Sequence, residues 1–367
     1  MQLALRLARR GLGNVWPNPA VGCVIVAGDE ARVLGRGWTR PGGRPHAEAE
    51  AVGQAVALSG EAALTGATAY VTLEPCDHHG QTSPCTERLI GVGISRVVAA
   101  CGDSDARVSG RGFARLRAAG IEVSTGPCEV EARELNRGYF LRQDHGRPLV
   151  TLKTATSLDG RIAMANGRSR WITGEAARAR AHLLRARHDA VAIGVTTAIA
   201  DDPELTVRLA GVARRSQPRV VFDSRLRLPV TSRLAAGARE APLWVIARPN
   251  PPSERATALR ELGAEVLAVE TDPATGRTKL ASGLAALAQR GITRLLVEGG
   301  GELAASFLQA GLVDEIAWFR APMLIGGDGL PAVGALGLED PAAASRFILV
   351  ERFTIDDDVL ETFRRRD

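Results

Sequence analysis

The sequence predicts an α/β protein of two domains. Its 367 residues exceed the length at which a single hydrophobic core usually stops growing. Short apolar runs alternate with stretches of helical periodicity in both halves, which favours mainly parallel sheets covered on both faces by helices. A segment with Gly and Pro, residues 144–150, interrupts this alternation. We therefore expect one domain at residues 1–145 and a second at residues 146–367.

The elements of the first domain follow from hydrophobic periodicity and β propensity. Helices are expected at residues 3–10, 46–58, 85–93 and 111–119. Strands are expected at residues 20–27, 67–73, 95–102 and 121–126.

The second domain begins with a strand at residues 149–157, followed by a helix at 174–188. Four further apolar runs predict buried strands at residues 189–195, 219–223, 243–247 and 294–298. The tail, residues 347–364, alternates apolar and polar side chains as an antiparallel pair does.

Composition narrows the location and the partners. No apolar run is long enough to cross a bilayer, and the N-terminus lacks a signal-peptide pattern, so we expect a cytoplasmic protein without a membrane partner. The net charge of +5 favours an anionic ligand. Aromatic residues are only 4% of the chain, too few for base-stacking platforms, so phosphorylated metabolites are favoured over nucleic acid. We also expect a homo-oligomer, a dimer or tetramer.

One constellation in the first half predicts a zinc site. His46-Ala47-Glu48 opens a helix, Pro75-Cys76 follows a strand, and Cys85 precedes another helix. An odd count of five cysteines without a signal peptide favours metal binding or burial over disulfides. One imidazole and two thiolates leave the fourth tetrahedral position of zinc to water. A carboxylate that does not bind the metal, Glu48, can then transfer protons, as in zinc nucleobase deaminases.

A second constellation predicts an anion site in the other half. An apolar strand runs into Glu298 and the glycines 299–301, and a helix begins there. Glycines allow the backbone to approach phosphate, and a helix start offers unpaired N–H groups. The arginines Arg185 and Arg208 can bind a phosphate through paired hydrogen bonds. Lys153, on the first strand of this half, is a candidate proton donor.

Together these segments resemble the bifunctional deaminase–reductases of riboflavin biosynthesis. Residues 74–85, with their long C-x8-C spacing, and residues 17–23 resemble the deaminase half. The resemblance to the reductase half lies in residues 153–161, 169–173, 184–186, 201–208 and 222–224 and in the Glu298 loop. The resemblance implies an N-terminal cytidine-deaminase-like α/β/α domain and a C-terminal dihydrofolate-reductase-like α/β domain.

The resemblance also implies roles for individual residues. In the first half, zinc is held by His46, Cys76 and Cys85, the proton shuttle is Glu48, and the pyrimidine contacts are Asn18 and His78. The implied NADPH contacts are Ala155, Trp171, Thr197, Asp201, Ser224, Gly300, Gly301, Glu302, Leu303, Ala304, Ala305 and Ser306. The implied contacts to the reductase substrate are Ser169, Arg185, Leu205, Arg208 and Glu298.

Two consecutive reactions are implied. The first is hydrolytic deamination of 2,5-diamino-6-(5-phosphoribosylamino)pyrimidin-4(3H)-one. The second is reduction by NADPH of the ribosyl group of 5-amino-6-(5-phosphoribosylamino)uracil to a ribityl chain.

The chain departs from the family pattern at several positions of the first half. Asp77 replaces a Ser, Ser83 replaces a Pro, and Gln81 replaces a basic residue that would suit the substrate phosphate. The run Asp103-Ser104-Asp105-Ala106 stands where the family has D-P-N-P. The sequence leaves open whether both activities are retained.

Alternatives stay open from the sequence. The first half could be an RNA or free-base deaminase with an unrelated second domain, or a closed structural zinc module in which His78 or Asp77 is the fourth ligand. Arg185 could be a solvated helix residue, Trp171 a core residue and Lys153 an ion-pair partner. Purely structural roles are expected for the remaining candidates: a turn at Asp159-Gly160, surface or packing positions for His79 and His145, and packing for Cys23, Cys101 and Cys128.

Overall fold

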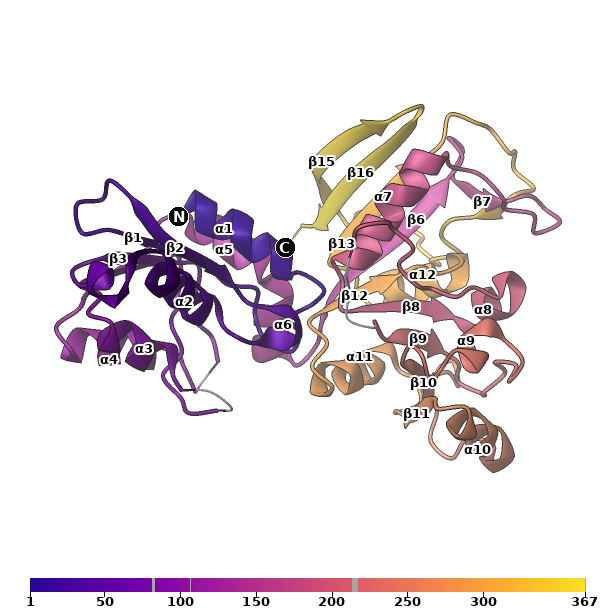
Figure 1. Cartoon of the computed structure of the whole chain (residues 1–367). Helices are drawn as coiled ribbons and strands as arrows, with labels where there is room; N and C mark the ends of the chain where they lie inside the picture. The colour runs from indigo at the N-terminus through magenta and orange to yellow at the C-terminus, as the bar shows by residue number, and fades with distance from the viewer. Residues whose placement is uncertain (81–82, 106, 213–216, 367) are drawn as a thin grey trace. The chain divides into compact units, whose positions relative to one another are not determined.

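The computed structural model describes residues 1–80, 83–105, 107–212 and 217–366. The chain divides into two compact units, Met1–Gly146 and Arg147–Asp367, both drawn in Figure 1. The division falls one residue after the boundary expected from the sequence. Gly146 lies there with a φ of 64° and ends the preceding helix in the left-handed conformation that glycine adopts without strain. Among the described residues, no helix combines the length and apolar character needed to cross a membrane.

The N-terminal unit is built on a five-stranded sheet with the order β2-β1-β3-β4-β5. Its strands are β1 (Gly22–Val26), β2 (Val33–Trp38), β3 (Thr68–Val71), β4 (Arg96–Ala99) and β5 (Glu122–Thr125). Its α-helices are α1 (Gln2–Ala8), α2 (Ala47–Ser59), α3 (Cys85–Gly91), α4 (Arg111–Ala118), α5 (Glu129–Leu135) and α6 (Arg137–His145). Short 3-10 turns lie at Arg9–Gly11, Pro41–Gly43 and Glu61–Leu64. Every helix and strand for which a range is expected here is present, and β2, α5 and α6 are additional.

The expectation of a mainly parallel sheet is wrong for this unit. β1 pairs antiparallel with both β2 and β3, whereas β3–β4 and β4–β5 are parallel. The physical reason is the connection between β1 and β2, residues 27–32, which is too short for the crossover that parallel neighbours need. The long connection through α2 joins β2 to β3, and these two strands lie on either side of β1, so β3 is antiparallel to β1 as well.

Two glycines of β2 bring α2 against the sheet. A Cβ at Gly35 would lie 2.1 Å from the carbonyl oxygen of Ala51, and one at Gly37 would lie 2.1 Å from that of Ala47. The helix backbone therefore packs directly on the strand, which is possible only without side chains at these positions. This contact determines where the first turn of α2, with Glu48, lies over the sheet.

The break between α5 and α6 is tied to the loop that follows α1. Asn136, only 4% exposed, accepts a hydrogen bond from the backbone N–H of Ala20 at 2.8 Å and donates one to its carbonyl oxygen at 3.0 Å. These two bonds position the segment that carries Asn18. The α5–α6 pair thereby helps to shape the site of this unit.

The C-terminal unit is built on a nine-stranded sheet with the order β11-β10-β9-β8-β12-β6-β13-β16-β15. Its strands are β6 (Leu149–Thr156), β8 (Ala190–Gly194), β9 (Arg219–Phe222), β10 (Leu243–Ala247), β11 (Glu265–Ala268), β12 (Arg294–Val297), β13 (Glu315–Arg320), β15 (Phe347–Ile355) and β16 (Asp358–Arg365). A separate small sheet joins β7 (Arg161–Ala163) and β14 (Leu330–Pro331). The helices are α7 (Glu175–Ala186), α8 (Val195–Asp201), α9 (Arg233–Ala236), α10 (Ser253–Glu261), α11 (Leu280–Gln289) and α12 (Gly301–Gln309), with a 3-10 turn at Pro341–Ala343.

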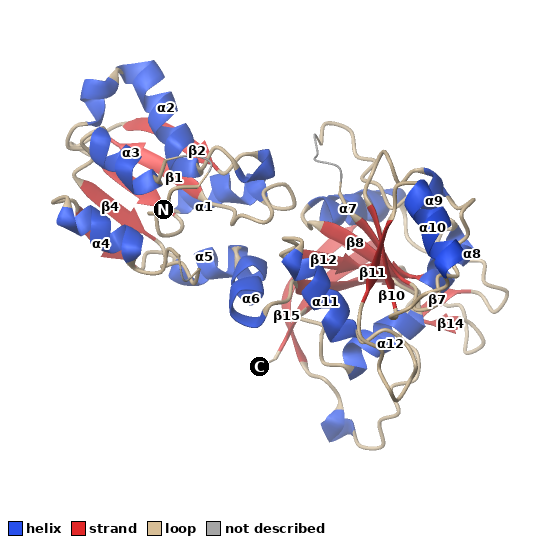
Figure 2. Ribbon diagram, turned by 90° about the horizontal axis from the view of Figure 1, so that it is seen from below, coloured by secondary structure: helices blue, strands red, loops and turns tan. Residues whose placement is uncertain are grey.

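Helices cover both faces of this sheet (Figure 2). Val221 and Val245 pack with Leu234 of α9 on one face. Phe222, the next residue of β9, points to the opposite face and meets Phe307 of α12 with ring centroids 5.6 Å apart. All six contacts among β6, β8, β9, β10, β11, β12 and β13 are parallel, and β15–β16 is an antiparallel hairpin. The expected mainly parallel sheet and the expected antiparallel pair at residues 347–364 are both confirmed for this unit.

Because these strands are parallel, their carboxyl ends meet at one edge of the sheet. The chain leaves β6, builds β8 to β11 outward on one side, and later inserts β12 between β6 and β8. In open α/β sheets, ligands bind outside the carboxyl ends of the strands where the strand order changes direction. The candidate residues of this half are therefore expected at this edge.

A buried histidine of this unit predicts a pH-dependent stability. His188 is 2% exposed, with Nδ1 2.8 Å from the Leu184 carbonyl oxygen and Nε2 2.9 Å from Thr151 Oγ1. Burial lowers the pKa of His188 to about 3. An unfolded chain protonates this imidazole below about pH 6.5 while the folded chain does not, so protonation favours unfolding as the pH falls from about 6.5 toward 3.

We expect the free energy of unfolding to fall by about 2 kcal/mol between pH 7 and pH 5 from this group. Urea unfolding of the wild-type chain and of a His188→Gln variant at the two pH values measures it. The variant is less stable at pH 7 but loses less stability on acidification. Equal losses in the two proteins would show that His188 is not the responsible group.

Candidate active sites

Three metal-binding side chains meet in the N-terminal unit. His46 is the residue before α2, Cys76 lies in the loop after β3, and Cys85 is the first residue of α3. The Nδ1 atom of His46 is 3.5 Å from the sulfur of Cys76 and 3.4 Å from that of Cys85. Their ligand atoms all lie within 4.8 Å of one another.

These distances fit a tetrahedral zinc ion. Zn–S bonds of about 2.3 Å and Zn–N bonds of about 2.05 Å at the tetrahedral angle separate nitrogen from sulfur by about 3.6 Å. Within the described part of the chain, the cluster has three members and includes neither His78 nor Asp77. Asp77 instead accepts a hydrogen bond from Thr86 Oγ1 at 2.5 Å. The donor set therefore fits an open, catalytic type of zinc site better than a closed structural one.

The electrostatics of the cluster favour an ionised ligand. Cys85 donates its backbone N–H to the Cys76 sulfur at 3.5 Å. Hydrogen bonds from Cys85, and further from His46, lower the pKa of Cys76 to about 4. Thiolate is the form of cysteine that binds zinc.

A buried carboxyl group lies beside the cluster without belonging to it. Glu48 sits in the first turn of α2 and is 3% exposed. Its carboxyl group lies within hydrogen-bonding reach of the Cys85 thiol. Burial raises the pKa of Glu48 to about 7. A carboxyl group next to the metal ligands, but not a ligand, is the arrangement needed for proton transfer at a bound water.

Asn18 is hydrogen-bonded to the segment that precedes His46, and His78 follows Cys76 by two residues. Asn18 donates Nδ2 to the Gly43 carbonyl oxygen at 2.9 Å, and a Cβ at Gly43 would lie 2.0 Å from the same nitrogen. Gly43 also has a φ of 84°, so glycine is required there on both grounds. The Nδ1 atom of His78 is buried and has no partner among the described residues. A buried polar atom without a partner is costly, which is consistent with a ligand that hydrogen-bonds to it.

The family departure at Asp105 is compensated within the same loop. Asp105 is 8% exposed, and its carboxylate accepts hydrogen bonds from Arg107 Nε at 3.0 Å and Nη2 at 2.5 Å. The hydrogen bond from Arg107 is the main cause that lowers the pKa of Asp105. The extra negative charge is therefore paired locally. Gln81 and Ala106 lie outside the described residues.

In the C-terminal unit, the predicted cofactor contacts meet at the carboxyl edge of the sheet. Ala155 is near the end of β6, Thr197 is in the first turn of α8 after β8, Ser224 follows β9, and residues 300–306 follow β12. Thr197 Oγ1 accepts the N–H of Gly300 at 3.1 Å. The remaining predicted residues of the segment are Gly301, Glu302, Leu303, Ala304, Ala305 and Ser306, which form the start of α12.

Three charged side chains form a buried cluster at the same edge. Arg185 holds Glu298 through two bonds, Nε to Oε1 at 2.5 Å and Nη2 to Oε2 at 2.9 Å. Lys153 Nζ lies 4.0 Å from Glu298 Oε2. Burial alone would raise the pKa of Glu298, but the charge of Arg185 brings it to about 2. Burial lowers the pKa of Lys153. The Arg185 side chain is 15% exposed, so its interpretation as a solvated helix residue is wrong.

The other predicted contacts of this half differ in exposure. Trp171 is 67% exposed, and the guanidinium of Arg178 lies 4.4 Å from its ring centroid, so it is not a core residue. Arg208 has a side chain 59% exposed and pairs with Glu204 at 3.0 Å. Leu205 is 5% exposed within an apolar core cluster, which leaves its side chain a packing role. Ser169 and Asp201 are partly or largely exposed.

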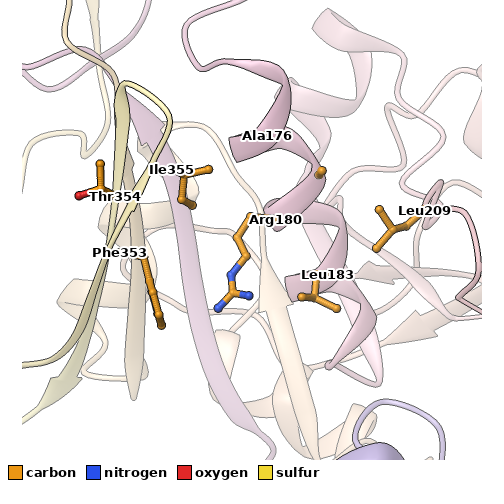
Figure 3. Close-up of a pocket in the computed structure, with 8 residues that line it drawn as sticks. Ala176, Arg180, Leu183, Leu209, Phe353, Thr354 and Ile355 are labelled. Atoms are coloured by element: carbon orange, nitrogen blue, oxygen red, sulfur yellow. The ribbon is translucent and has the colours of Figure 1, made fainter.

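A pocket of about 360 Å3 lies between α7 and β15 (Figure 3). Its lining is mostly apolar, and the guanidinium of Arg180 lies 5.0 Å from the ring centroid of Phe353. At about 100° per residue, Arg180 and Arg185 point from different faces of α7. No predicted site residue lines this pocket, so it is separate from the charged cluster at the sheet edge.

The purely structural roles expected for the remaining candidates are confirmed. None of the five cysteines forms a disulfide; Cys23 and Cys101 are buried, and Cys128 packs against the core. His79 and His145 are exposed. Gly160 has a φ of 74° in a turn, where Asp159 accepts backbone N–H groups of residues 325 and 326.

Comparison with known proteins shows which family has this pair of sites. Residues 148–360 match the RibD C-terminal domain, and residues 1–101 match the cytidine and deoxycytidylate deaminase zinc-binding region. The riboflavin biosynthesis protein RibD of Aquifex aeolicus is 44% identical over 92% of this chain and 90% of its own length. The chain belongs to the RibD family.

Solved RibD structures have the same architecture throughout. Acinetobacter baumannii RibD, form 2, has 38% identity and a TM-score of 0.85, covering 100% of this chain and 97% of that one. A Thermotoga maritima protein, described as a diaminohydroxyphosphoribosylaminopyrimidine deaminase/5-amino-6-(5-phosphoribosylamino)uracil reductase, has 34% identity and a TM-score of 0.85 over 100% and 97% of the two chains. The expected fold class is confirmed for both halves, and the alternative of an unrelated second domain is wrong.

Some residues of this RibD chain became candidates only through the fold. Thr278 donates its N–H to Ser224 Oγ at 2.9 Å, and His182 Nδ1 accepts the N–H of Arg208 at 3.3 Å. Arg107 pairs with Asp105, as described above. The sequence carried a signal only for Arg107, which stands two residues after an acid that departs from the family pattern.

Proposed function

We propose that this RibD-family chain catalyses two consecutive steps of riboflavin biosynthesis. Residues 1–145 deaminate 2,5-diamino-6-(5-phosphoribosylamino)pyrimidin-4(3H)-one with one zinc ion, and residues 146–367 reduce the product with NADPH. The observation that carries the proposal is the gathering of His46, Cys76 and Cys85 at tetrahedral spacing beside Glu48. The cytoplasmic location and a homo-oligomeric state remain predictions.

In the deaminase half, the chain's own residues orient the pyrimidine and move protons. Zinc held by the three ligands lowers the pKa of a coordinated water to about 7. Glu48 accepts a proton as water adds to the ring carbon that bears the amine, and it passes this proton to the ring nitrogen. It then takes the second proton from the new hydroxyl group on that carbon and gives it to the amine, which leaves as ammonia. His78 and Asn18 hold the pyrimidine in register for this transfer.

In the reductase half, NADPH supplies the hydride to C1′ of the ribosyl group. The C1′–O4′ bond opens, and Lys153 donates the proton that the freed oxygen takes. Nε and Nη2 of Arg185 already bind Glu298, and its Nη1 donates to the Thr206 carbonyl oxygen at 3.1 Å. We therefore assign the substrate phosphate to Arg208 and a positioning role to Arg185. Glu298 keeps the Lys153 side chain charged in a buried place, although burial lowers the pKa of Lys153.

Removing the metal tests whether deamination and reduction take place at separate sites. Ammonia release from the diaminopyrimidine ribotide is measured with and without NADPH, before and after chelation. Chelation is expected to abolish ammonia release, while NADPH oxidation on the already deaminated substrate keeps its rate. Readdition of zinc restores the first activity. Parallel loss of both activities would contradict two separate sites.

A further inference from the structure

The chain segment that carries Arg208 is hydrogen-bonded to α7 at two points. Nη1 of Arg185 donates to the carbonyl oxygen of Thr206 at 3.1 Å. The backbone N–H of Arg208 donates to Nδ1 of His182 at 3.3 Å. The two bonds attach residues 206–208 to the helix at both ends of this short stretch.

Both attachment points lie on one face of α7. His182 precedes Arg185 by three residues, and side chains at this spacing lie next to each other on a helix. Arg185 is already fixed, because two of its nitrogens bind the buried carboxylate of Glu298. His182 is half-buried beside it. The imidazole therefore belongs to the same face of the helix as the buried charged cluster.

The surroundings of His182 keep its imidazole neutral. Four charged groups lie around the ring: Arg185 on its own helix, Arg208 on the attached segment, Lys153 on β6 and Glu298 after β12. Burial, followed by the charges of Arg185 and Arg208, lowers the pKa of His182. A neutral imidazole that accepts a hydrogen bond at Nδ1 carries its proton on Nε2. The bond from the Arg208 N–H is therefore retained at neutral pH.

The guanidinium of Arg208 is available for exchange between partners. Its side chain is 59% exposed and pairs with Glu204 at 3.0 Å. Glu204 also lies 3.6 Å from Arg233. An exposed ion pair of this kind stabilises little, so a phosphate can replace Glu204 while Glu204 keeps its second arginine. A long, exposed side chain reaches a defined place only if its backbone is fixed, and His182 fixes the backbone at this residue.

We propose that His182 is a positioning residue of the reductase half, which holds the backbone of Arg208 so that its guanidinium meets the substrate phosphate. The proposal rests on the proposed function, which assigns the phosphate to Arg208. It makes binding of the phosphorylated substrate, and not hydride transfer, the step that depends on His182.

The test compares three variants on two substrates. NADPH oxidation is measured on the deaminated ribotide and on its dephosphorylated nucleoside for His182→Ala, His182→Asn and His182→Gln. The amide oxygen of Asn stands as far from Cβ as Nδ1 does, so it keeps the acceptor, whereas Gln carries its amide one bond further out. We expect KM for the ribotide to rise about 3- to 10-fold in the Ala and Gln variants, the effect of one neutral hydrogen bond. The value of kcat and the activity on the nucleoside stay within about twofold, and His182→Asn retains the wild-type KM.

A double-mutant cycle shows whether His182 acts through Arg208. Arg208→Gln alone is expected to raise KM for the ribotide about 10- to 100-fold, the range of a charge-assisted hydrogen bond. Adding His182→Ala then raises KM by less than about twofold, because the group that His182 positions is gone. His145→Ala removes an exposed histidine of the other unit and leaves KM unchanged. The affinity for NADPH alone, measured by fluorescence quenching, stays at the wild-type value in every variant.

Several results would overturn the role of His182 while the proposed reduction stands. These are an unchanged KM in His182→Ala, an undiminished effect of His182→Ala in the Arg208→Gln background, equal losses on ribotide and nucleoside, or a parallel loss of NADPH binding. A wild-type chain that does not oxidise NADPH with the ribotide would overturn the proposed function and the positioning role together.

Discussion

Replacing Glu48 by Gln is expected to lower the rate of ammonia release by about 100- to 10,000-fold, the range of a lost general acid–base catalyst. Gln has nearly the same shape and fits the buried first turn of α2, but it cannot take a proton from water. Because Glu48 is not part of the ligand cluster, zinc content is expected to stay at one per chain. Steady-state ammonia release and metal analysis of the same preparation check both statements.

Glu50 offers a matched control on the same helix. It lies two residues beyond Glu48 and pairs with Arg40 at 2.6 Å, so Glu50→Gln removes an equal charge without reaching the metal centre. Its rate is expected to stay within about threefold of the wild type, since a partly exposed ion pair contributes only about 0–1 kcal/mol. If Glu48→Gln retained the rate of Glu50→Gln, or lost zinc in proportion to activity, Glu48 would not be the shuttle.

Replacing Arg185 by Leu is expected to destabilise the C-terminal unit by about 3–5 kcal/mol, because it leaves the buried Glu298 carboxylate without its partner. Lys153 at 4.0 Å compensates only in part. NADPH oxidation is lost, since Glu298 and Lys153 are no longer held in place, while ammonia release by the other half persists. Urea unfolding and the two activity assays measure these effects.

A second variant separates stability from activity at this cluster. Adding Glu298→Gln to Arg185→Leu removes the unpaired charge, so most of the stability returns although the reductase stays inactive. The pKa of Glu298 lies at about 2 in the wild type because of Arg185; this contribution to stability is present above about pH 4.5 and is lost as the pH falls toward 2. Recovery of activity in the double variant would mean that neither residue positions the catalytic group.

Much of the candidate deaminase centre could be predicted from the sequence because its chemistry lies in residue types. His46, Glu48, Cys76 and Cys85 have few other reasons to occur at helix starts and strand ends in this order. The partners of these residues were not predictable in the same way. Asn18 and Gly43, which are hydrogen-bonded just before the metal ligand His46, are 25 positions apart in the chain, and no periodicity relates one loop to another.

The sequence alone determined the α/β class, the ligand set and many of the helices and strands, because hydrophobic periodicity and side-chain chemistry act locally. Only the tertiary structure decided that β1 pairs antiparallel with β2 and β3. It also decided that Asn136 is hydrogen-bonded to Ala20, and that the guanidinium of Arg185 binds the carboxylate of Glu298, 113 residues away. Such pairings depend on which strands become neighbours and which charges are buried together. That outcome follows from the packing of the whole unit, since burial makes an unpaired charge costly wherever its partner lies in the chain.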